Sequence, residues 1–425
     1  MPLSVDRALR KAQSHIKAEE LAEAEELYRQ VLSKFPKNKK AIQGYQKLKA
    51  GITSKGLSNF EPPQEQVQEL INLYNPGHHE KALKKVKSLI SLFPKAITLH
   101  NIQGASNAAL QRYDAAIDSY KQALKIKPDY ADAYYNMGNA QKNKGDLDAA
   151  IDSYKQALKI KPDYADAYYN MGIVLRAKGD LDAAIDSYKQ ALKIKPDYAK
   201  VKHLVASLTG ETTKTAPREY VEDLFDQYAA KFEHTLIENL LYQTPKIITE
   251  MIIKRHPSKA LGSVLDLGCG TGLAGLELEQ FCEQLDGIDL SKSMLRQARA
   301  KGVYGKLIHG DIAEHLAEAD LDFDYFISTD VFIYVGELSD VFRLIKSRNR
   351  RRAKLVFSTE HAEGKDFYLE KSGRYSHSKS YIEGLCNKYG YHLSHFEKTK
   401  LRKEKSEFLM GGLYLLDFDP AETTG

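Results

Sequence analysis

Small and apolar residues in the first half of the chain recur at helical spacing inside units of constant length. The string DAAIDSYKQALKIKPDYADAYYNMG begins at Asp114 and again at Asp148, and a third copy begins at Asp182 and departs after Ala199. Prolines punctuate the chain at the same interval: Pro94, Pro128, Pro162 and Pro196. Residues three and four positions apart share one helix face, so each unit is expected to contain two helices and a closing turn.

These units resemble the tetratricopeptide repeat, a helix–turn–helix motif of the same length. Tyr134, Met137 and Gly138 fall on the first predicted helix of one unit, and Ala150 and Tyr154 fall on the second. The small residues allow the two helices to approach closely, and the aromatic rings fill the groove between them. The resemblance implies a stacked helical array, an α-solenoid.

The array is expected to cover residues 1–209 and to contain about five units. Two weaker units precede the clear copies, and the prolines that close them, Pro36 and Pro94, are separated by less than two full repeat intervals. An irregular segment at 37–63 is therefore predicted to interrupt the stack. Residues 197–209 are predicted to form the capping helix that such arrays need.

The resemblance also implies a concave groove on the first helix of each unit. Amide and cationic side chains there are suited to bind the carboxylate or the backbone of a protein or peptide partner. The candidates are Asn136, Lys142, Asn170 and Arg176. In the alternative interpretation, the near-identical copies reflect recent duplication and these side chains are simply solvated.

The second half of the chain alternates short apolar runs with amphipathic stretches. Residues 210–218 are polar and contain proline, so they are predicted to be a linker to a domain at 219–425. Strands are expected near 263–267, 285–290, 305–309, 323–328 and 353–359, with a closing antiparallel pair at 391–402 and 407–418. This order predicts a Rossmann-like, doubly wound sheet of seven strands, and the fold class of the whole chain is therefore α plus α/β.

Composition narrows the class of protein. The chain has 425 residues with 62 Lys and Arg against 57 Asp and Glu, a net charge of +5 that gives little reason to expect a nucleic-acid partner. Three cysteines cannot form a disulfide framework, and the N-terminal segment lacks the apolar core of a signal peptide. No apolar run is long enough to predict a membrane span, so we expect a cytoplasmic protein.

The candidate chemistry lies where the predicted strands end. The first strand carries Asp266 and runs into a glycine turn, Gly268, Gly270 and Gly272, where backbone N–H groups can approach a ligand closely. The spacing G-x-G-x-G differs from the dinucleotide fingerprint, and no P-loop lysine follows. Asp289 ends the second strand and is placed to bind a ribose diol, whereas the alternative for these acids is helix capping.

Together with Asp311 after the third strand, this set resembles the class I S-adenosylmethionine-dependent methyltransferases over about residues 219–417. The combination of both halves is similar to bacterial methyltransferases with N-terminal tetratricopeptide repeats. The resemblance implies S-adenosylmethionine as cofactor, with the glycine turn on its methionine part, Asp289 on its ribose, Asp311 on its adenine and the helix of Phe225 as a lid. The implied cofactor-binding set is Asp266, Gly268, Cys269, Gly270, Gly272, Asp289, Leu290, Asp311, Ile312 and Tyr228.

The acceptor side is expected at the ends of the fourth and fifth strands. Asp330 and Tyr334 are the first candidates for acceptor contact, although Asp330 is also suited to a capping or cofactor-side role. Glu360 follows the fifth strand and Arg374 and Tyr375 lie in the loop after it, and all three are candidates for substrate contact. The arginine and tyrosine of this loop, with His377, are suited to bind an anionic acceptor. His377 is a candidate base near neutral pH, the alternative being a plain surface loop.

Other sites are not expected. The histidines of the second half lack the close spacing of metal ligands, so no metal site is predicted. The cationic run at 346–354 precedes the fifth strand and is expected to be a solvated loop. No Asn/Asp-Pro-Pro-Tyr motif follows the fourth strand, which disfavours nucleic-acid bases as acceptors.

Two functions compete at this point. The first is a methyltransferase for an unidentified acceptor, whose repeats recruit or orient a protein or peptide. The second is a repeat scaffold whose methyltransferase-like domain binds the cofactor without catalysis.

Overall fold

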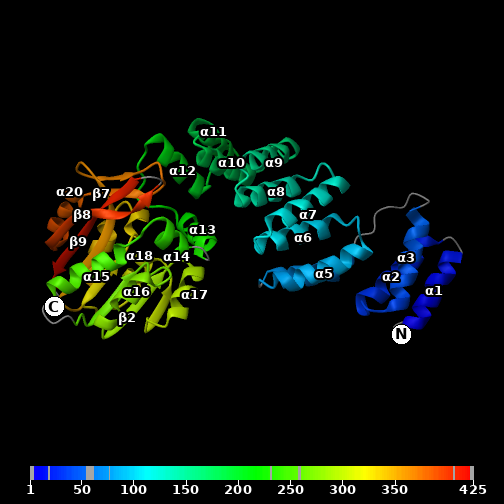
Figure 1. The fold of residues 1–425 in the computed structure, drawn as a ribbon, viewed down its shortest axis with the longest axis horizontal. Coiled ribbons are helices and arrows are strands. Elements are labelled where there is room, and N and C mark those ends of the chain that lie inside the picture. The colour runs from blue at the N-terminus through cyan, green and yellow to red at the C-terminus, as the bar shows by residue number, and fades with distance from the viewer. Residues whose placement is uncertain are drawn as a thin grey trace. The chain divides into compact units, whose positions relative to one another are not determined.

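The computed structural model consists of two compact units, Met1–Pro196 and Asp197–Gly425 (Figure 1). It describes residues 4–17, 20–53, 62–75, 77–229, 232–256, 260–404 and 407–421. The division between Pro196 and Asp197 precedes the boundary expected at 209/210. Helix α12 (Ala199–Thr209) is therefore grouped with the second unit, and its role as a cap of the array stays a prediction.

The described residues of the first unit form five helix pairs and one additional helix, in agreement with the expected repeats. The additional helix, α3 (Lys39–Thr53), lies where the proline spacing is irregular. The pairs are α1 (Val5–Lys17) with α2 (Leu21–Lys34), α4 (Gln64–Tyr74) with α5 (His79–Leu92), α6 (Ile97–Ala109) with α7 (Tyr113–Ile126), α8 (Ala131–Lys144) with α9 (Leu147–Ile160), and α10 (Ala165–Lys178) with α11 (Leu181–Ile194).

A tyrosine packed on a glycine holds each clear pair together. Tyr154 of α9 is fully buried, and a Cβ atom built at Gly138 of α8 would lie 2.7 Å from its ring. The same close contact recurs between Gly172 and the buried Tyr188. Glycine is required at these positions because the ring occupies the space of a side chain.

The second unit contains a nine-stranded sheet rather than the seven strands expected. Its main path has the order β3-β2-β1-β4-β5-β7-β6, while β9 pairs antiparallel with β5 and with β8. The first five strands are parallel, which confirms the doubly wound fold. The strands are β1 (Ser263–Leu267), β2 (Gln284–Asp289), β3 (Lys306–His309), β4 (Tyr325–Ser328), β5 (Ala353–Ala362), β6 (Phe367–Leu369), β7 (Tyr375–Ser378), β8 (His392–Glu404) and β9 (Glu407–Phe418).

Two apolar clusters cover the two faces of this sheet. Helices α15 (Thr244–Arg255) and α16 (Leu273–Leu278) pack on one face, and α18 (Ile312–Glu318), α19 (Ser339–Arg348) and α20 (Lys379–Tyr389) pack on the other. The remaining elements are α13 (Arg218–Tyr228), α14 (Phe232–His234), the π-helix η2 (Thr235–Asn239), η3 (Glu279–Phe281), α17 (Lys292–Lys301) and η4 (Phe332–Tyr334).

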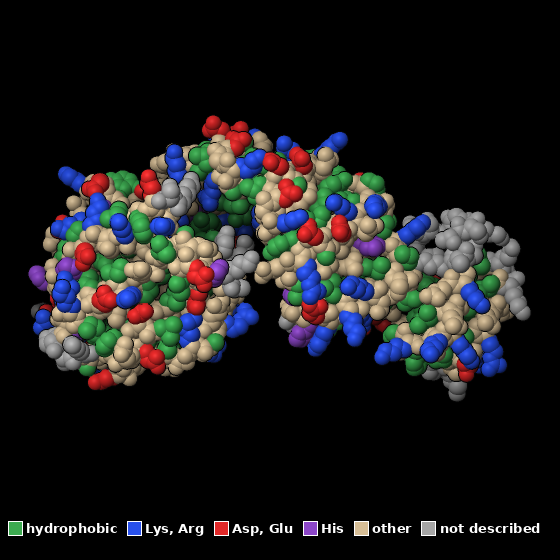
Figure 2. Space-filling model, viewed as in Figure 1, with side chains coloured by type: hydrophobic (Ala, Val, Ile, Leu, Met, Phe, Trp, Pro, Cys, Tyr) green, Lys and Arg blue, Asp and Glu red, His purple; other side chains and the backbone are tan. Residues whose placement is uncertain are grey.

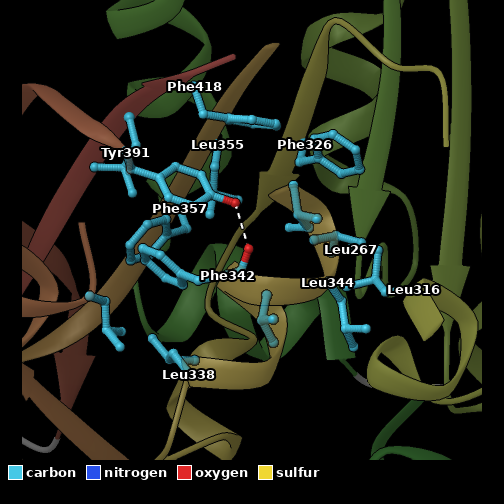
Figure 3. Packing of buried hydrophobic residues seen from close by; sticks show 14 of the residues in the cluster. Leu267, Leu316, Phe326, Leu338, Phe342, Leu344, Leu355, Phe357, Tyr391 and Phe418 are labelled. Carbon is cyan, nitrogen blue, oxygen red and sulfur yellow. Dashed lines mark hydrogen bonds between the residues drawn. The ribbon is translucent and has the colours of Figure 1, made fainter. Parts of the chain in front are cut away.

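The apolar side chains of the central strands alternate between the two faces of the sheet and so contribute to both clusters. In β5, Leu355 and Phe357 belong to the larger cluster and Val356 belongs to the other, because neighbouring side chains of a strand point to opposite faces. Figure 3 shows the larger cluster, in which the Tyr391 hydroxyl donates a hydrogen bond to the Phe342 carbonyl at 2.8 Å. Both faces of the sheet are thus covered by helices, so a ligand can approach the sheet only at the ends of its strands.

Charged side chains of both signs are interspersed on the visible face of each unit (Figure 2). In the cationic run, Arg350 pairs with Asp320 at 2.5 Å, and Arg351 pairs with Asp322 at 2.5 Å. The expected solvated loop is therefore shorter than 346–354: residues 346–348 belong to α19 and Lys354 to β5, and the exposed Arg350 to Arg352 lie between them. Among the described residues, no helix is long and apolar enough to cross a membrane.

Replacing Gly138 with alanine should lower the free energy of unfolding of the array by about 1–3 kcal/mol, because the new methyl group overlaps the buried Tyr154 ring. Chemical denaturation followed by circular dichroism measures this change. In a Tyr154→Val background the ring is gone, so Gly138→Ala should cost almost nothing there. An equal cost in both backgrounds would contradict the proposed packing.

Candidate active site

The carboxyl ends of the parallel strands open into one cavity of about 850 Å³. Gly268 and Gly270 follow β1, Asp289 ends β2, and Asp311 lies just beyond β3, and all four line this cavity. Parallel strands bring their carboxyl ends to the same edge of a sheet, which is why residues distant in the sequence meet here. The volume lies within the range of small-ligand sites.

The glycine turn adopts a backbone that other residues rarely take. Gly268 and Gly270 have φ angles of 79° and 54°, and a Cβ atom at Gly268 would overlap the side chain of Val331. Gly272, with φ 91°, precedes helix α16 and does not line the cavity. The turn therefore keeps the backbone of β1 close to the cavity while starting the next helix.

Asp289 joins the tips of β1 and β2. Its carboxylate accepts a hydrogen bond from the Gly270 N–H and another from the Ser291 N–H, both at 2.8 Å. Burial raises the pKa of this carboxyl to about 6, and the two N–H donors oppose that rise. Each oxygen retains a lone pair, so the carboxylate can accept hydroxyl groups from the cavity.

Asp311 serves as a helix cap and also reaches the cavity. Its Oδ1 accepts hydrogen bonds from the N–H groups of Ala313 (2.8 Å) and Glu314 (3.1 Å) at the start of α18. Among the described residues its Oδ2 has no hydrogen-bond partner. The capping alternative is thus correct for one oxygen, and the other stays available to a ligand.

Three apolar or weakly polar side chains of the predicted set also line the cavity: Cys269, Leu290 and Ile312. Cys269 is buried, and burial raises the pKa of its thiol well above the ordinary value. A neutral thiol packed in the turn is a poor nucleophile.

Asp266 does not line the cavity. It is fully buried in β1, where its Oδ2 accepts a hydrogen bond from the Tyr304 hydroxyl at 2.7 Å. Burial raises the pKa of this carboxyl to about 7, and the Tyr304 hydroxyl opposes that rise. Asp266 is therefore placed to support the strand tip rather than to contact a ligand directly.

Helix α13 and the residues after it cover the cavity. Phe225 and Phe232 line it, and the rings of Phe225 and Tyr334 meet edge to face with their centroids 5.3 Å apart. The Ser291 hydroxyl donates to Asp226 at 2.5 Å, which attaches this helix to the turn after β2. The side chain of Tyr228, predicted to bind the cofactor, lies outside the described residues.

Asp330 and Tyr334 line the other half of the cavity, after β4. Asp330 has a φ of 56°, a strained backbone for this residue that surrounding contacts must hold. Its N–H and its Oδ1 both bond to the Ser358 hydroxyl, at 2.8 and 2.6 Å, and its Oδ2 accepts from Arg402 at 3.0 Å. Burial raises the pKa of Tyr334, so its hydroxyl stays a donor.

Two arginines share a buried carboxylate behind this half of the cavity. Glu360 lies in β5, and its Oε1 accepts from Arg374 at 2.5 Å and from Arg402 at 2.6 Å. Arg374 and Arg402 line the cavity, whereas Glu360 does not. Glu360 thus positions the arginines instead of contacting a substrate. Arg402 was not among the predicted residues, because it lies in a polar stretch of the sequence that carries no recognisable motif.

His377 and Tyr375 are not in the expected loop. Both belong to strand β7 and are fully buried, and neither lines the cavity. Burial lowers the pKa of His377 to about 4, and its Nε2 faces the carbonyls of Val335 and Gly336 at 3.0 and 2.9 Å. The expectation of a base near neutral pH was therefore wrong.

In the array, the structure brings some of the groove candidates together. The Nζ of Lys142 donates to Asn170 Oδ1 at 3.2 Å, and burial lowers the pKa of this lysine. Asn136 donates to Asn101 at 3.2 Å. The Nη1 of Arg176 is buried without a hydrogen-bond partner in the described chain. Lys142 and Asn170 thus bind each other, whereas Asn136 binds a residue outside the candidate set.

Known families match both halves of the chain. Models of the tetratricopeptide repeat match residues 8–38, 104–145, 142–175 and 165–198, and a model described as a methyltransferase domain matches residues 264–350. The chain thus combines tetratricopeptide repeats with a methyltransferase domain. The methyltransferase match includes the ends of β1, β2 and β3, where Gly268, Gly270, Asp289 and Asp311 line the cavity.

The matches to curated relatives cover only parts of this chain. Human methyltransferase-like protein 27 is 32% identical over 120 residues, which is 27% of this chain and 46% of the relative. An uncharacterized methyltransferase of Schizosaccharomyces pombe is 39% identical over 67 residues, 16% of this chain and 25% of the relative. The chain thus spans less than half the length of either protein.

A solved structure of magnesium protoporphyrin IX methyltransferase from Synechocystis with bound SAH is 17% identical. The superposition covers 47% of this chain and 98% of the solved chain, with a TM-score of 0.38.

Affinity for S-adenosylhomocysteine should fall roughly tenfold per pH unit below about pH 6 and stay level above it. The expected cause is Asp289: protonation below its pKa of about 6 neutralises the carboxylate that is predicted to accept hydrogen bonds from the ribose hydroxyls. Isothermal calorimetry between pH 5 and 8 measures the profile.

Two variants test whether Asp289 is the group whose protonation weakens binding. Asp289→Asn should bind more weakly with no fall near pH 6, whereas Asp266→Asn should keep the fall. A wild-type profile that is flat from pH 5 to 8 would contradict the role of Asp289.

Proposed function

We propose that this protein is an S-adenosylmethionine-dependent methyltransferase acting on an acceptor that enters the second half of the cavity. The observation that carries the proposal is that the glycine turn, Asp289 and Asp311 line one cavity at three neighbouring strand ends. These groups suit the three parts of the cofactor: N–H groups for a carboxylate, a carboxylate for a diol, and an acid beside an apolar side chain for a purine.

The residues of the cofactor half bind and orient. S-adenosylmethionine supplies an activated methyl group when it is bound. The free lone pairs of Asp289 accept hydroxyl groups, the Oδ2 of Asp311 accepts from an amine, and Ile312 covers a ring face. Phe225 and Phe232 exclude water from above, which favours transfer to the acceptor over side reactions.

The residues of the acceptor half align the second substrate. Asp330 is held by Ser358 and Arg402 at the end of β4, next to the glycine turn through Val331. Its carboxylate is placed to orient an acceptor hydroxyl or amine and to take its proton where the reaction requires that. Tyr334 and Arg374 present donors to the rest of the acceptor.

The array is proposed to recruit a protein or peptide partner through Asn136, Lys142, Asn170 and Arg176. The buried, unpaired Nη1 of Arg176 supports this role, because a ligand carbonyl or carboxylate would satisfy it. A cytoplasmic location stays a prediction.

Incubation of the full chain with methyl-tritiated S-adenosylmethionine and host-cell lysate should label one fraction among proteins, nucleic acids and small molecules. Nucleic acid is the fraction expected to stay unlabelled. The Gly270→Asp variant is the control, because the new carboxylate repels the carboxylate of Asp289 and fills the space proposed for the cofactor. Labelling by this variant should be lower than that by the wild type by at least roughly a hundredfold.

Equal labelling by the wild type and Gly270→Asp would contradict methyl transfer. If the wild type then still bound S-adenosylhomocysteine, the chain would be a cofactor-binding scaffold instead.

A further inference from the structure

A segment that precedes the methyltransferase match is built into the acceptor half of the cavity. This segment, residues 199–217, consists of helix α12 and residues 210–217, which were expected to be a capping helix and a linker. Helices α8, α10 and α12 begin at Ala131, Ala165 and Ala199, so α12 keeps the register of the repeats in the sequence.

Main-chain hydrogen bonds attach the segment to the loop after β4. The Glu337 N–H donates to the Lys214 carbonyl at 2.7 Å, and the Ala216 N–H donates to the Tyr334 carbonyl at 3.1 Å. Between them, Thr215 forms an antiparallel bridge with Val335. Residues 214–216 thus act as a short added strand against the loop that carries Tyr334.

Side chains attach the same segment to the turn between β6 and β7. The Nε2 of His203 donates to the Gly373 carbonyl at 2.9 Å, and the hydroxyls of Thr213 and Tyr375 share a hydrogen bond of 2.5 Å. His203 is 2% exposed, and its ring lies 5.0 Å from the ring of Tyr220. Gly373 and Tyr375 flank Arg374, so both neighbours of this arginine are held by the segment.

The segment also forms part of the cavity wall itself, through Lys214, Thr215 and Ala216. The bonds described above end on Tyr334 and Glu337, which line the cavity, and on Gly373 and Tyr375, which flank the cavity-lining Arg374. A displacement of about 1 Å in groups that align a substrate can cost roughly a hundredfold in rate. The segment is therefore in a position to control use of the acceptor without touching the cofactor residues.

We propose that the 199–217 segment is a positioning element of the acceptor site, with His203 as its main positioning residue. It sets the places of Tyr334 and Arg374 and determines which acceptors the cavity accepts. The consequence for acceptor use rests on the proposed methyl transfer, whereas the positioning itself does not.

Hydrogen exchange of the full chain tests the positioning directly. His203→Phe keeps the ring packing and removes the donor, so amides at 369–375 should exchange roughly fivefold faster, in line with one lost hydrogen bond. Amides at 268–272 and 289–291 should not change. His203→Gln, which restores a donor, should return the exchange toward that of the wild type. Lys202→Ala on the exposed side of the same helix is the matched control.

The same variants separate acceptor use from cofactor binding. His203→Phe should bind S-adenosylhomocysteine within about twofold of the wild type but label the acceptor fraction roughly tenfold more slowly, with recovery in His203→Gln. Unchanged exchange at 369–375, or equal acceleration at 268–272, would overturn the positioning role. A wild type that binds no S-adenosylhomocysteine would instead refute the proposed function, and the exchange pattern would still decide the positioning.

Discussion

The hydrogen bond from the Gly270 N–H to the Asp289 carboxylate joins two neighbouring strand tips, and the geometry of the cavity depends on it. It requires a left-handed glycine after β1 and a carboxylate at the end of β2, and the parallel pairing of the two strands brings them together. The same contact keeps the carboxylate close to where a ribose would lie. A single main-chain donor thus links the fold of the sheet to its chemistry.

The acceptor half of the cavity is held together mainly by ion pairs between side chains. Four charged groups in and behind it are buried or half-buried and mutually paired: Arg402 bridges Asp330 and Glu360, and Arg374 shares Glu360. Removing one member of such a set leaves an uncompensated charge, so the groups hold one another in fixed places. This half is therefore rigid through electrostatics, whereas the cofactor half is rigid through backbone geometry.

Local sequence features predicted the array and most of the residues that line the cavity at the ends of β1, β2 and β3, although Asp266 and Gly272 do not line it. The array repeats almost identically at a fixed interval, and the cofactor residues lie within a few positions of strand ends that apolar runs mark clearly. These features depend on local spacing, which a single sequence displays directly.

The acceptor half depends on distant contacts, which is why much of it was missed. Arg402 lies in a polar run that looks exposed, but its strand pairs with β9 and buries it. His377 and Tyr375 belong to a short strand without an apolar pattern, and pairing with β5 and β6 buries both. Residues 214–216 look like a linker because their partner, the loop of Tyr334, lies far along the chain, beyond β4.

A crystal structure of the full chain with S-adenosylhomocysteine tests the central claim most directly. The account predicts density across the three strand ends, with the amino-acid part on the turn at Gly268 and Gly270, the ribose on Asp289 and the adenine beside Asp311 and Ile312. Density bound elsewhere, or an empty cavity at saturating ligand, would contradict it.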